Sequence, residues 1–495
     1  MSAPASTPEL AKVSSKEQEV FAEHDERTLE TGGTADRKRL ERKLLWKLDA
    51  RFCLFIILYI LNYIDRQNAS AARLKGFEKD LGLHGTQYAT VLSILYVGYI
   101  LTQIPSNIIV QKTGRPSLWL PACMLTWGAL SVATGAAKNY GQVIAIRFLL
   151  GIAESAFFPG ALMTLASWYP KRELGQRITL LYCGSLISNA FGPLIAAGIL
   201  GRMEGAGGVR AWRWLFYIEG AITMAVAVIS VFILPDFPHN SRGFTAEEKE
   251  LAQLRMTEDV GVKDETNVST WTALKLALGD YRLWVFSLTL TAMVVGLSFN
   301  AYFPTLTKTL GYSSEVSLLL CAPPFVWAAI VAYFVSRDSD KRQERYLHIV
   351  VPLVFGIVGA IIAMTCRKSF GASYFALFLM ASSYAGFVVF YAWTASTFAR
   401  PAMTRSISLA FVNAFSQLGN ISGSYVWPSK WAPYTKSYGI VIAMFAATII
   451  GLTIIRFDLV RLNKKLAARD ESEAKGQEHH GLSATDYPAG FRYTL

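Results

Sequence analysis

Four charged residues lie inside, or at the edge of, segments that are otherwise apolar enough to cross a lipid bilayer. They are Asp65, Arg66, Arg147 and Glu154. An ionised side chain at the centre of a membrane helix costs about 2.5–3.5 kcal/mol even on the most lenient insertion scale, so it persists mainly where it pairs or handles ions. Two acids and two arginines therefore predict a pathway that handles charge.

The spacing of Arg147 and Glu154 places both on one face of a helix, about 10 Å apart along its axis. A carboxyl group in apolar surroundings takes up a proton more readily than in water, whereas a guanidinium stays charged and can bind a carboxylate through two hydrogen bonds. Two alternatives stay open. Arg147 and Glu154 could form a purely structural ion pair, and Asp65 with Arg66 could be solvated near the outer end of their helix.

Polar and aromatic side chains in other apolar segments could line a binding site. Asn413, Gln417 and Asn420 follow one another at i, i+4 and i+7 and so share one helix face. In lipid such amides must bond across helices or face water, and the sequence favours neither substrate contact nor interhelical bonding. Four more side chains are candidates for a substrate-binding wall, with simple packing as the alternative: Tyr63, Asn300, Tyr391 and Trp393.

The surroundings of these residues predict an all-α polytopic membrane protein. The 495 residues are 52% hydrophobic and only 17% charged, and apolar runs recur near the ~20 residues that a bilayer needs. Twelve helices are expected, at 48–69, 88–111, 117–137, 140–168, 177–200, 212–235, 282–306, 314–336, 345–366, 371–398, 406–428 and 437–457.

These helices divide into two halves of six. The expected plan is a disordered N-terminal tail at 1–47, a first half at 48–235, a polar linker at 236–281, a second half at 282–457 and a tail at 458–495. Leu81-Gly82 and Leu310-Gly311 open corresponding turns, and Arg115 and Arg345 follow them at nearly equal spacing. Such a duplication is typical of transporters that rock around a midplane site.

The basic residues predict the orientation of the chain. Seven Lys and Arg residues fall between positions 37 and 51, against three between 73 and 79, so both termini and the linker should be cytoplasmic. The net charge of +12 then suits anionic lipid, and no nucleic-acid partner is expected. The five cysteines show no CxxC spacing, so neither a metal site nor a disulfide framework is expected.

Several motifs resemble the anion:cation symporter family within the major facilitator superfamily, especially its fungal allantoate-permease branch. The resemblance covers about residues 48–457. The matching segments are Leu61–Asn68 (LNYIDRQN), Arg147–Glu154 (RFLLGIAE), Phe158–Gly160, Trp168–Pro170, Trp212–Gly220 (WRWLFYIEG), Pro235–Pro238, Asn413–Tyr425 and Trp427-Pro428.

This resemblance implies a twelve-helix transporter of the plasma membrane that works as a monomer and imports a small organic anion together with protons. Asp65 and Glu154 would carry the protons, and Arg66 and Arg147 would attract the anion. No cofactor is needed beyond the proton gradient, and the chain has no GxxxxGK[ST] loop for ATP. An efflux antiporter and a nutrient-sensing receptor are the alternatives. No catalytic constellation points to an enzyme.

The chain departs from the family in the loop between the second and third helices. The acidic gate residue of the usual pattern is missing, where Asn107, Gln111, Lys112 and Gly114 precede Arg115. The corresponding loop in the second half, Ser339-Asp340-Lys341 with Arg345, matches the usual pattern more closely. Arg115, Asp340 and Arg345 are therefore the expected gating residues, in an asymmetric pair of gates.

Overall fold

The computed structural model describes residues 34–260, 270–398, 402–474 and 491–495, and within these ranges the regular elements are helices without any strand. Each predicted membrane span coincides with a helix or with helices in line. The first half contains α2 (Thr34–Arg73), α4 (Gln87–Thr113), α5 (Pro116–Ala136), α6 (Tyr140–Glu154) with α7 (Phe157–Trp168), α8 (Lys171–Arg202) and α9 (Ala211–Ile233).

The second half repeats this plan with more interrupted helices. It contains α12 (Tyr281–Gly296), η2 (Leu297–Tyr302) and α13 (Phe303–Lys308) in line, α14 (Ser314–Leu319) with α15 (Ala322–Arg342), α16 (Tyr346–Thr365), α17 (Phe370–Ser382) with α18 (Tyr384–Thr397), α19 (Ala402–Ser424) and α20 (Thr435–Ala474). Short elements connect them: α3 (Phe77–Asp80), η1 (Ala206–Gly208), α10 (Ala246–Val260), α11 (Thr270–Gly279) and η3 (Ser429–Trp431).

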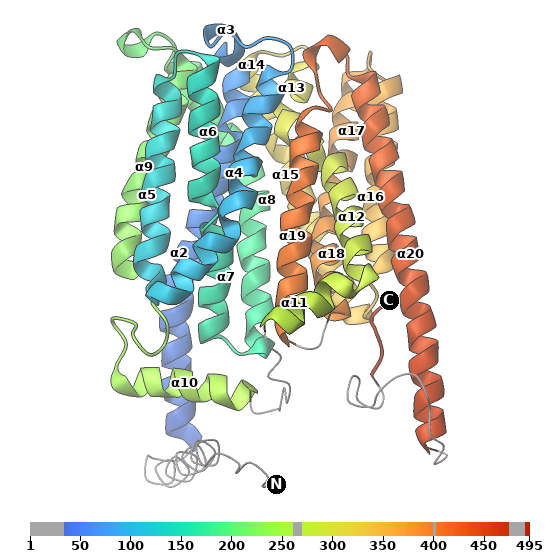
Figure 1. Cartoon of the computed structure of the whole chain (residues 1–495). Coiled ribbons are helices and arrows are strands. Elements are labelled where there is room, and N and C mark those ends of the chain that lie inside the picture. Colours follow the sequence, from blue (N-terminus) through green and yellow to red (C-terminus); the bar gives the residue numbers. More distant parts are fainter. Residues whose placement is uncertain (1–33, 261–269, 399–401, 475–490) are drawn as a thin grey trace, which may run out of the picture.

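The two halves stand side by side as bundles, blue to green and yellow to red in Figure 1. They meet where α8 packs on α14 and α15 and where α4 packs on α19. Nine helical segments among the described residues are long and apolar enough to cross a membrane. Polar and charged residues interrupt the apolar stretches of α2 and α19, which are not among these nine.

The helix ends differ from prediction at both tails. The first helix begins at Thr34, so residues 34–47 of the predicted disordered tail are helical, and the last helix continues to Ala474 instead of ending at 457. These extensions project from the same end of the bundle (Figure 1). The charged residues of these extensions disfavour burial in lipid but do not prevent a helix. The prediction from apolar length therefore ended both helices too early.

The linker between the halves is also more ordered than its composition predicts. It contains α10 and α11, and α10 begins with a capping box in which Thr245 Oγ1 accepts from the Glu248 N–H at 3.2 Å while Glu248 accepts from the Thr245 N–H at 3.0 Å. The Glu248 side chain is fully buried against α2, where Lys47 binds it at 2.8 Å. The linker is therefore fastened to the extension of the first helix.

The Glu248 contact yields a pH-dependent prediction. Burial alone would raise the pKa of the Glu248 carboxyl, but hydrogen bonds from Lys47 and the Thr245 main chain outweigh it and lower the pKa below its ordinary value of 4.5. The contact then stabilises the fold above pH 4.5 and is lost as the pH falls through the lowered pKa. We expect Glu248→Gln to melt a few degrees lower than the natural chain at pH 7.

The measurement is thermal unfolding of the purified protein followed by intrinsic fluorescence at pH 7 and at pH 4 or below. The difference between Glu248→Gln and the natural chain should shrink in acid. Glu247→Gln is the matched control, because Glu247 is exposed one position earlier on the same helix. Equal melting of both variants at pH 7 would contradict this role for Glu248.

Candidate functional site

A cavity of about 190 Å³ lies between the two halves. Its walls come from α2, α4, α6, α7 and α8 in the first half and from α12, η2, α18 and α19 in the second. The polar residues of α2 and α19 contribute to this wall: Asn62, Arg66 and Gln67 from α2, and Asn413, Gln417 and Asn420 from α19. The charged side of the cavity belongs to the first half, and the amide side belongs mainly to the second.

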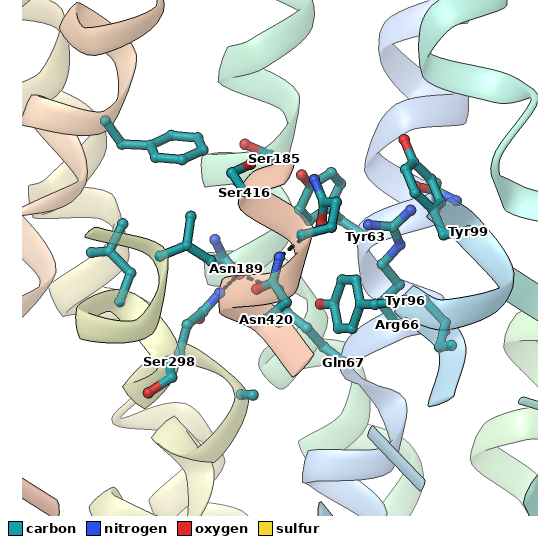
Figure 2. A pocket seen from close by; sticks show the side chains of 18 of the residues that line it. Tyr63, Arg66, Gln67, Tyr96, Tyr99, Ser185, Asn189, Ser298, Ser416 and Asn420 are labelled. Atoms are coloured by element: carbon teal, nitrogen blue, oxygen red, sulfur yellow. Dashed lines mark hydrogen bonds between the residues drawn. The ribbon is translucent and has the colours of Figure 1, made fainter. Parts of the chain in front are cut away.

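The charged side contains an ion pair between two helices. Arg66 Nε on α2 donates to Glu154 Oε2 on α6 at 2.5 Å, and the Glu154 side chain is fully buried. Figure 2 shows Arg66 among the rings of Tyr63, Tyr96 and Tyr99. Its guanidinium lies 5.4 Å from the Tyr63 ring centre and 5.1 Å from that of Tyr99. Glu154 thus pairs with Arg66 across helices, and the structural pair with Arg147 that the sequence left open as an alternative is not formed.

Arg147 lines the same cavity and is 1% exposed. Its Nε and Nη2 atoms are buried without a hydrogen-bond partner among the described residues. A ring lies near its charge, since the guanidinium carbon is 5.7 Å from the Phe216 ring centre. Burying a charge without hydrogen bonds is costly, so this guanidinium provides a ready binding site for an anion that enters the cavity.

Asp65 lies on the other side of α2 and does not line the cavity. It is 1% exposed and accepts hydrogen bonds from Trp127 Nε1 at 3.2 Å, Ser131 Oγ at 3.3 Å and Thr223 Oγ1 at 3.0 Å. The donors come from α5 and α9, so the solvated position that the sequence left open is excluded. Neighbouring residues on a helix point about 100° apart, which separates Asp65 from Arg66.

Glu219 of α9 is a buried acid that the sequence motifs alone did not assign. It lies one turn before Thr223, is 4% exposed, and neither carboxyl oxygen has a hydrogen-bond partner in the described part of the chain. The i, i+4 spacing to Thr223 is the sequence signal that could have placed it near Asp65.

The second half lines the cavity with amides and tyrosines. Tyr391 Oη donates to Asn413 Oδ1 at 3.0 Å, and Asn420 Nδ2 donates to Gln417 Oε1 at 2.8 Å. All four residues line the cavity. The bond between Tyr391 and Asn413 joins α18 to α19, whereas the bond between Gln417 and Asn420 lies within α19. The stripe thus makes one interhelical bond and faces the cavity, and its contact with substrate stays a prediction.

Asn300 joins the halves at the cavity. Its Nδ2 donates to Asn189 Oδ1 of α8 at 3.2 Å, and Gln67 of α2 donates to the same oxygen (Figure 2). Asn189 was absent from the sequence prediction, although Ser185 and Asn189 share a helix face at i, i+4 and both line the cavity. Several tyrosines were missed as well, because a tyrosine in a membrane helix is equally common in simple packing: Tyr59, Tyr96, Tyr99, Tyr182 and Tyr384.

Trp393 was expected in the substrate wall, and the structure places it elsewhere. It is fully buried outside the cavity and its indole donates to the Thr494 carbonyl at 2.9 Å. Tyr391 does line the cavity, and a residue two positions further along a helix points about 200° away. The two aromatic residues therefore cannot share one wall.

The predicted gating residues lie at the end of the bundle from which α2 and α20 project. Arg345 Nη1 binds Asp340 at 2.5 Å and Ser339 Oγ at 3.0 Å, all within the second half. Arg115 is exposed at the N-cap of α5. The side chains of Asn107 and Gln111 lie outside the described residues. The local geometry at Arg345 suits a gate, and that role remains a prediction.

The opposite end of the bundle is held closed by polar contacts between the halves. Lys75 binds Glu315, Arg73 Nη2 donates to Ser429 Oγ at 2.8 Å, and the Tyr425 hydroxyl lies 3.0 Å from Thr90 Oγ1. Each contact joins an element of the first half to one of the second. These contacts hold the two halves together at the end away from the projecting helix ends.

We predict that breaking the pair of Lys75 and Glu315 opens this end. A cysteine at the cavity position Ser70 should react severalfold faster with a membrane-impermeant thiol reagent from that side in Glu315→Gln. Exposed Cys53 and Cys366 are first replaced by serine. Exchanging the charges, with Lys75→Glu and Glu315→Lys together, should restore slow labelling. Unchanged labelling in Glu315→Gln would show that the pair does not hold the closure.

The fold and this site together define a two-half helical membrane transporter, and the fold and relatives are those of transporters and not of enzymes. The chain belongs to the major facilitator superfamily, whose family model matches residues 55–424. The MFS-type transporter cnsO of Penicillium expansum is 33% identical over 473 residues, which cover 92% of this chain and 90% of that protein.

Other similar proteins agree with this assignment. The putative metabolite transport protein NicT of Pseudomonas putida is 31% identical over 327 residues, covering 65% of this chain and 72% of that protein. Among solved structures, a D-xylose–proton symporter superposes with a TM-score of 0.62 at 15% identity, over 81% of this chain and 96% of that one. A bacterial homologue of the lysosomal transporter Spinster, inward-facing and occupied, gives 0.61 at 17% identity, over 81% and 94%.

Proposed function

We propose that the protein is a proton-coupled importer of a small organic anion, of the allantoate-permease-like branch of the anion:cation symporter family. A carboxylate, vitamin or ureide such as nicotinate, pantothenate, biotin or allantoate is the substrate class. The observation that carries the proposal is Arg147, a buried guanidinium in the cavity wall, two of whose nitrogens lack a hydrogen-bond partner in the part of the chain that the structure describes. A carboxylate can fill both positions at once.

Proton coupling follows from the ion pair beside this site. While Glu154 is ionised it holds Arg66 at 2.5 Å, so Arg66 has little charge to offer a substrate. Protonation of Glu154 removes that attraction and leaves Arg66 available to the anion. Asp65 is the second proton site, fixed by its three donors behind α2. An anion therefore binds best together with a proton, which is the thermodynamic requirement for symport.

The cavity amides would orient the rest of the substrate. Asn300, Tyr391, Asn413 and Gln417 can exchange their mutual hydrogen bonds for bonds to polar atoms of a ligand. Alternating access then proceeds by opening the end away from the projecting helix ends while the end near Arg115, Asp340 and Arg345 closes. We place the protein in the plasma membrane as a monomer, with lipid as its surroundings, cytoplasmic termini and no nucleic-acid partner.

The first test of the proposal is uptake driven by a proton gradient in proteoliposomes. Labelled nicotinate, pantothenate, biotin and allantoate are offered under imposed proton or sodium gradients. Uptake of at least one should accelerate in acid outside, and a protonophore should abolish accumulation. Glu154→Gln should still exchange substrate but no longer accumulate it, because an amide cannot release a proton. Uptake that follows sodium, or accumulation by Glu154→Gln, would overturn the coupling.

Arg147→Lys separates anion binding from a structural role. Lysine keeps the charge but lacks the planar fork that binds both carboxylate oxygens. We expect the apparent KM to rise about tenfold or more, which corresponds to about 1.4 kcal/mol, with normal amounts of protein at the membrane. Arg213→Lys is a control, since Arg213 binds main-chain carbonyls of Gly135 and Ala137 away from the cavity. Unchanged uptake kinetics in Arg147→Lys would assign Arg147 to packing alone.

A further inference from the structure

Residues Phe491–Leu495 lie against the second half near its lower end, where the C-terminus is marked in Figure 1. We call the set of side chains and main-chain groups that they contact the groove. The groove is formed by Arg282 of α12, Arg345 at the start of α16, Trp393 of α18 and Asn463 of α20. None of these residues lines the cavity, and the transport mechanism above does not use the segment. Four helices of the second half thus contact these five residues, although α12, α16 and α18 are far from the segment in sequence.

The groove binds the main chain of the segment. Asn463 Nδ2 donates to the Tyr493 carbonyl at 2.9 Å, and the Tyr493 N–H donates to Asn463 Oδ1 at 2.8 Å. Trp393 Nε1 donates to the Thr494 carbonyl at 2.9 Å, and the Arg345 N–H donates to a Leu495 oxygen at 2.5 Å. Main-chain bonds of this kind provide affinity when a protein binds an extended peptide.

One side chain of the segment provides specificity. Tyr493 is 5% exposed, and its hydroxyl accepts from Arg282 Nη1 at 3.2 Å. Arg282 is itself fixed by Asp280, whose Oδ2 lies 2.7 Å from Nη2. Phe491 packs on Tyr493 with ring centres 5.1 Å apart. Arg492 lies on the outside, 39% exposed, where it binds Asp470 at 2.8 Å.

We propose that this groove is a peptide-binding site whose ligand is the chain's own segment Phe491–Leu495, and that its occupancy holds the turn between α15 and α16 in place. Arg345 is the last residue of that turn, and Asp340 lies in the last helical turn of α15 before it. The first N–H groups of a helix have no partner within the helix, and Leu495 supplies one at Arg345. The guanidinium of Arg345 also donates to Asp340 at 2.5 Å. Segment and gate therefore share Arg345.

An occupied groove also keeps the second half rigid. Asn463, Trp393 and Arg282 would each lose a hydrogen-bond partner if the segment left, and an unsatisfied buried polar group costs more than an exposed one. The bonds to three consecutive residues link α16, α18 and α20 at one level. Rocking between two states requires each half to move as a unit. By linking these helices, the segment helps the second half to move as one body.

The binding claim is tested with protein that lacks residues 491–495 and a synthetic Phe-Arg-Tyr-Thr-Leu peptide labelled at its N-terminus. Fluorescence polarisation should show saturable binding to the shortened protein and none to the full chain, whose groove is filled. Asn463→Ala in the shortened protein should weaken binding at least tenfold, and Arg492→Ala in the peptide should weaken it threefold or less. Absent binding, or equal binding of a scrambled peptide, would overturn the proposal.

The gating claim needs a reporter on the turn. A spin label at the exposed position Lys341, with Cys53 and Cys366 replaced by serine, should become more mobile when residues 491–495 are removed. Added peptide should reverse the change. A label at His84, exposed at the other end of the bundle, should respond to neither. If the peptide binds while the Lys341 label keeps its mobility throughout, the groove exists but the hold on the gate is refuted.

Discussion

Charge buried in a membrane protein is the constraint on which the rest of this structure depends. Arg66 meets it by pairing with Glu154 at 2.5 Å, and Asp65 meets it by accepting three hydrogen bonds. Arg147 is 1% exposed, and two of its nitrogens have no hydrogen-bond partner among the described residues. Such a group is costly unless something binds it. The fold places this guanidinium on the wall of the cavity.

The first helix connects these elements. Asp65 and Arg66 are neighbours on α2, yet one faces α5 and α9 and the other faces the cavity, because successive residues turn by about 100°. In the mechanism that we propose, a change in charge at Asp65 occurs one residue away from the ion pair of Arg66 and Glu154. The proposed proton and substrate sites are then coupled over a short distance, without a long-range rearrangement.

Much of the fold could be predicted from sequence, since apolar length and turn residues determine where helices cross a bilayer. The pairing of helices could not. Glu154 seemed a partner for Arg147 because they share a helix face, but the contact with Arg66 depends on how α2 and α6 pack. The prediction that Trp393 lines the cavity was wrong for a related reason, since an aromatic side chain does not indicate which face of α18 points to the cavity. Asn189 bonds to Gln67 through the packing of α8 on α2, and to Asn300 only where the halves meet.

The two halves contribute different chemistry to the cavity, and this division suggests how binding drives movement. The guanidinium groups come from α2 and α6, whereas the stripe of Asn413, Gln417 and Asn420 comes from α19. A simple anion satisfies only the first half. A ligand that has both a carboxylate and other polar groups can contact both halves at once. It makes the most contacts when the two halves close around it. Only such a ligand has the differential affinity for a closed cavity that a conformational change requires.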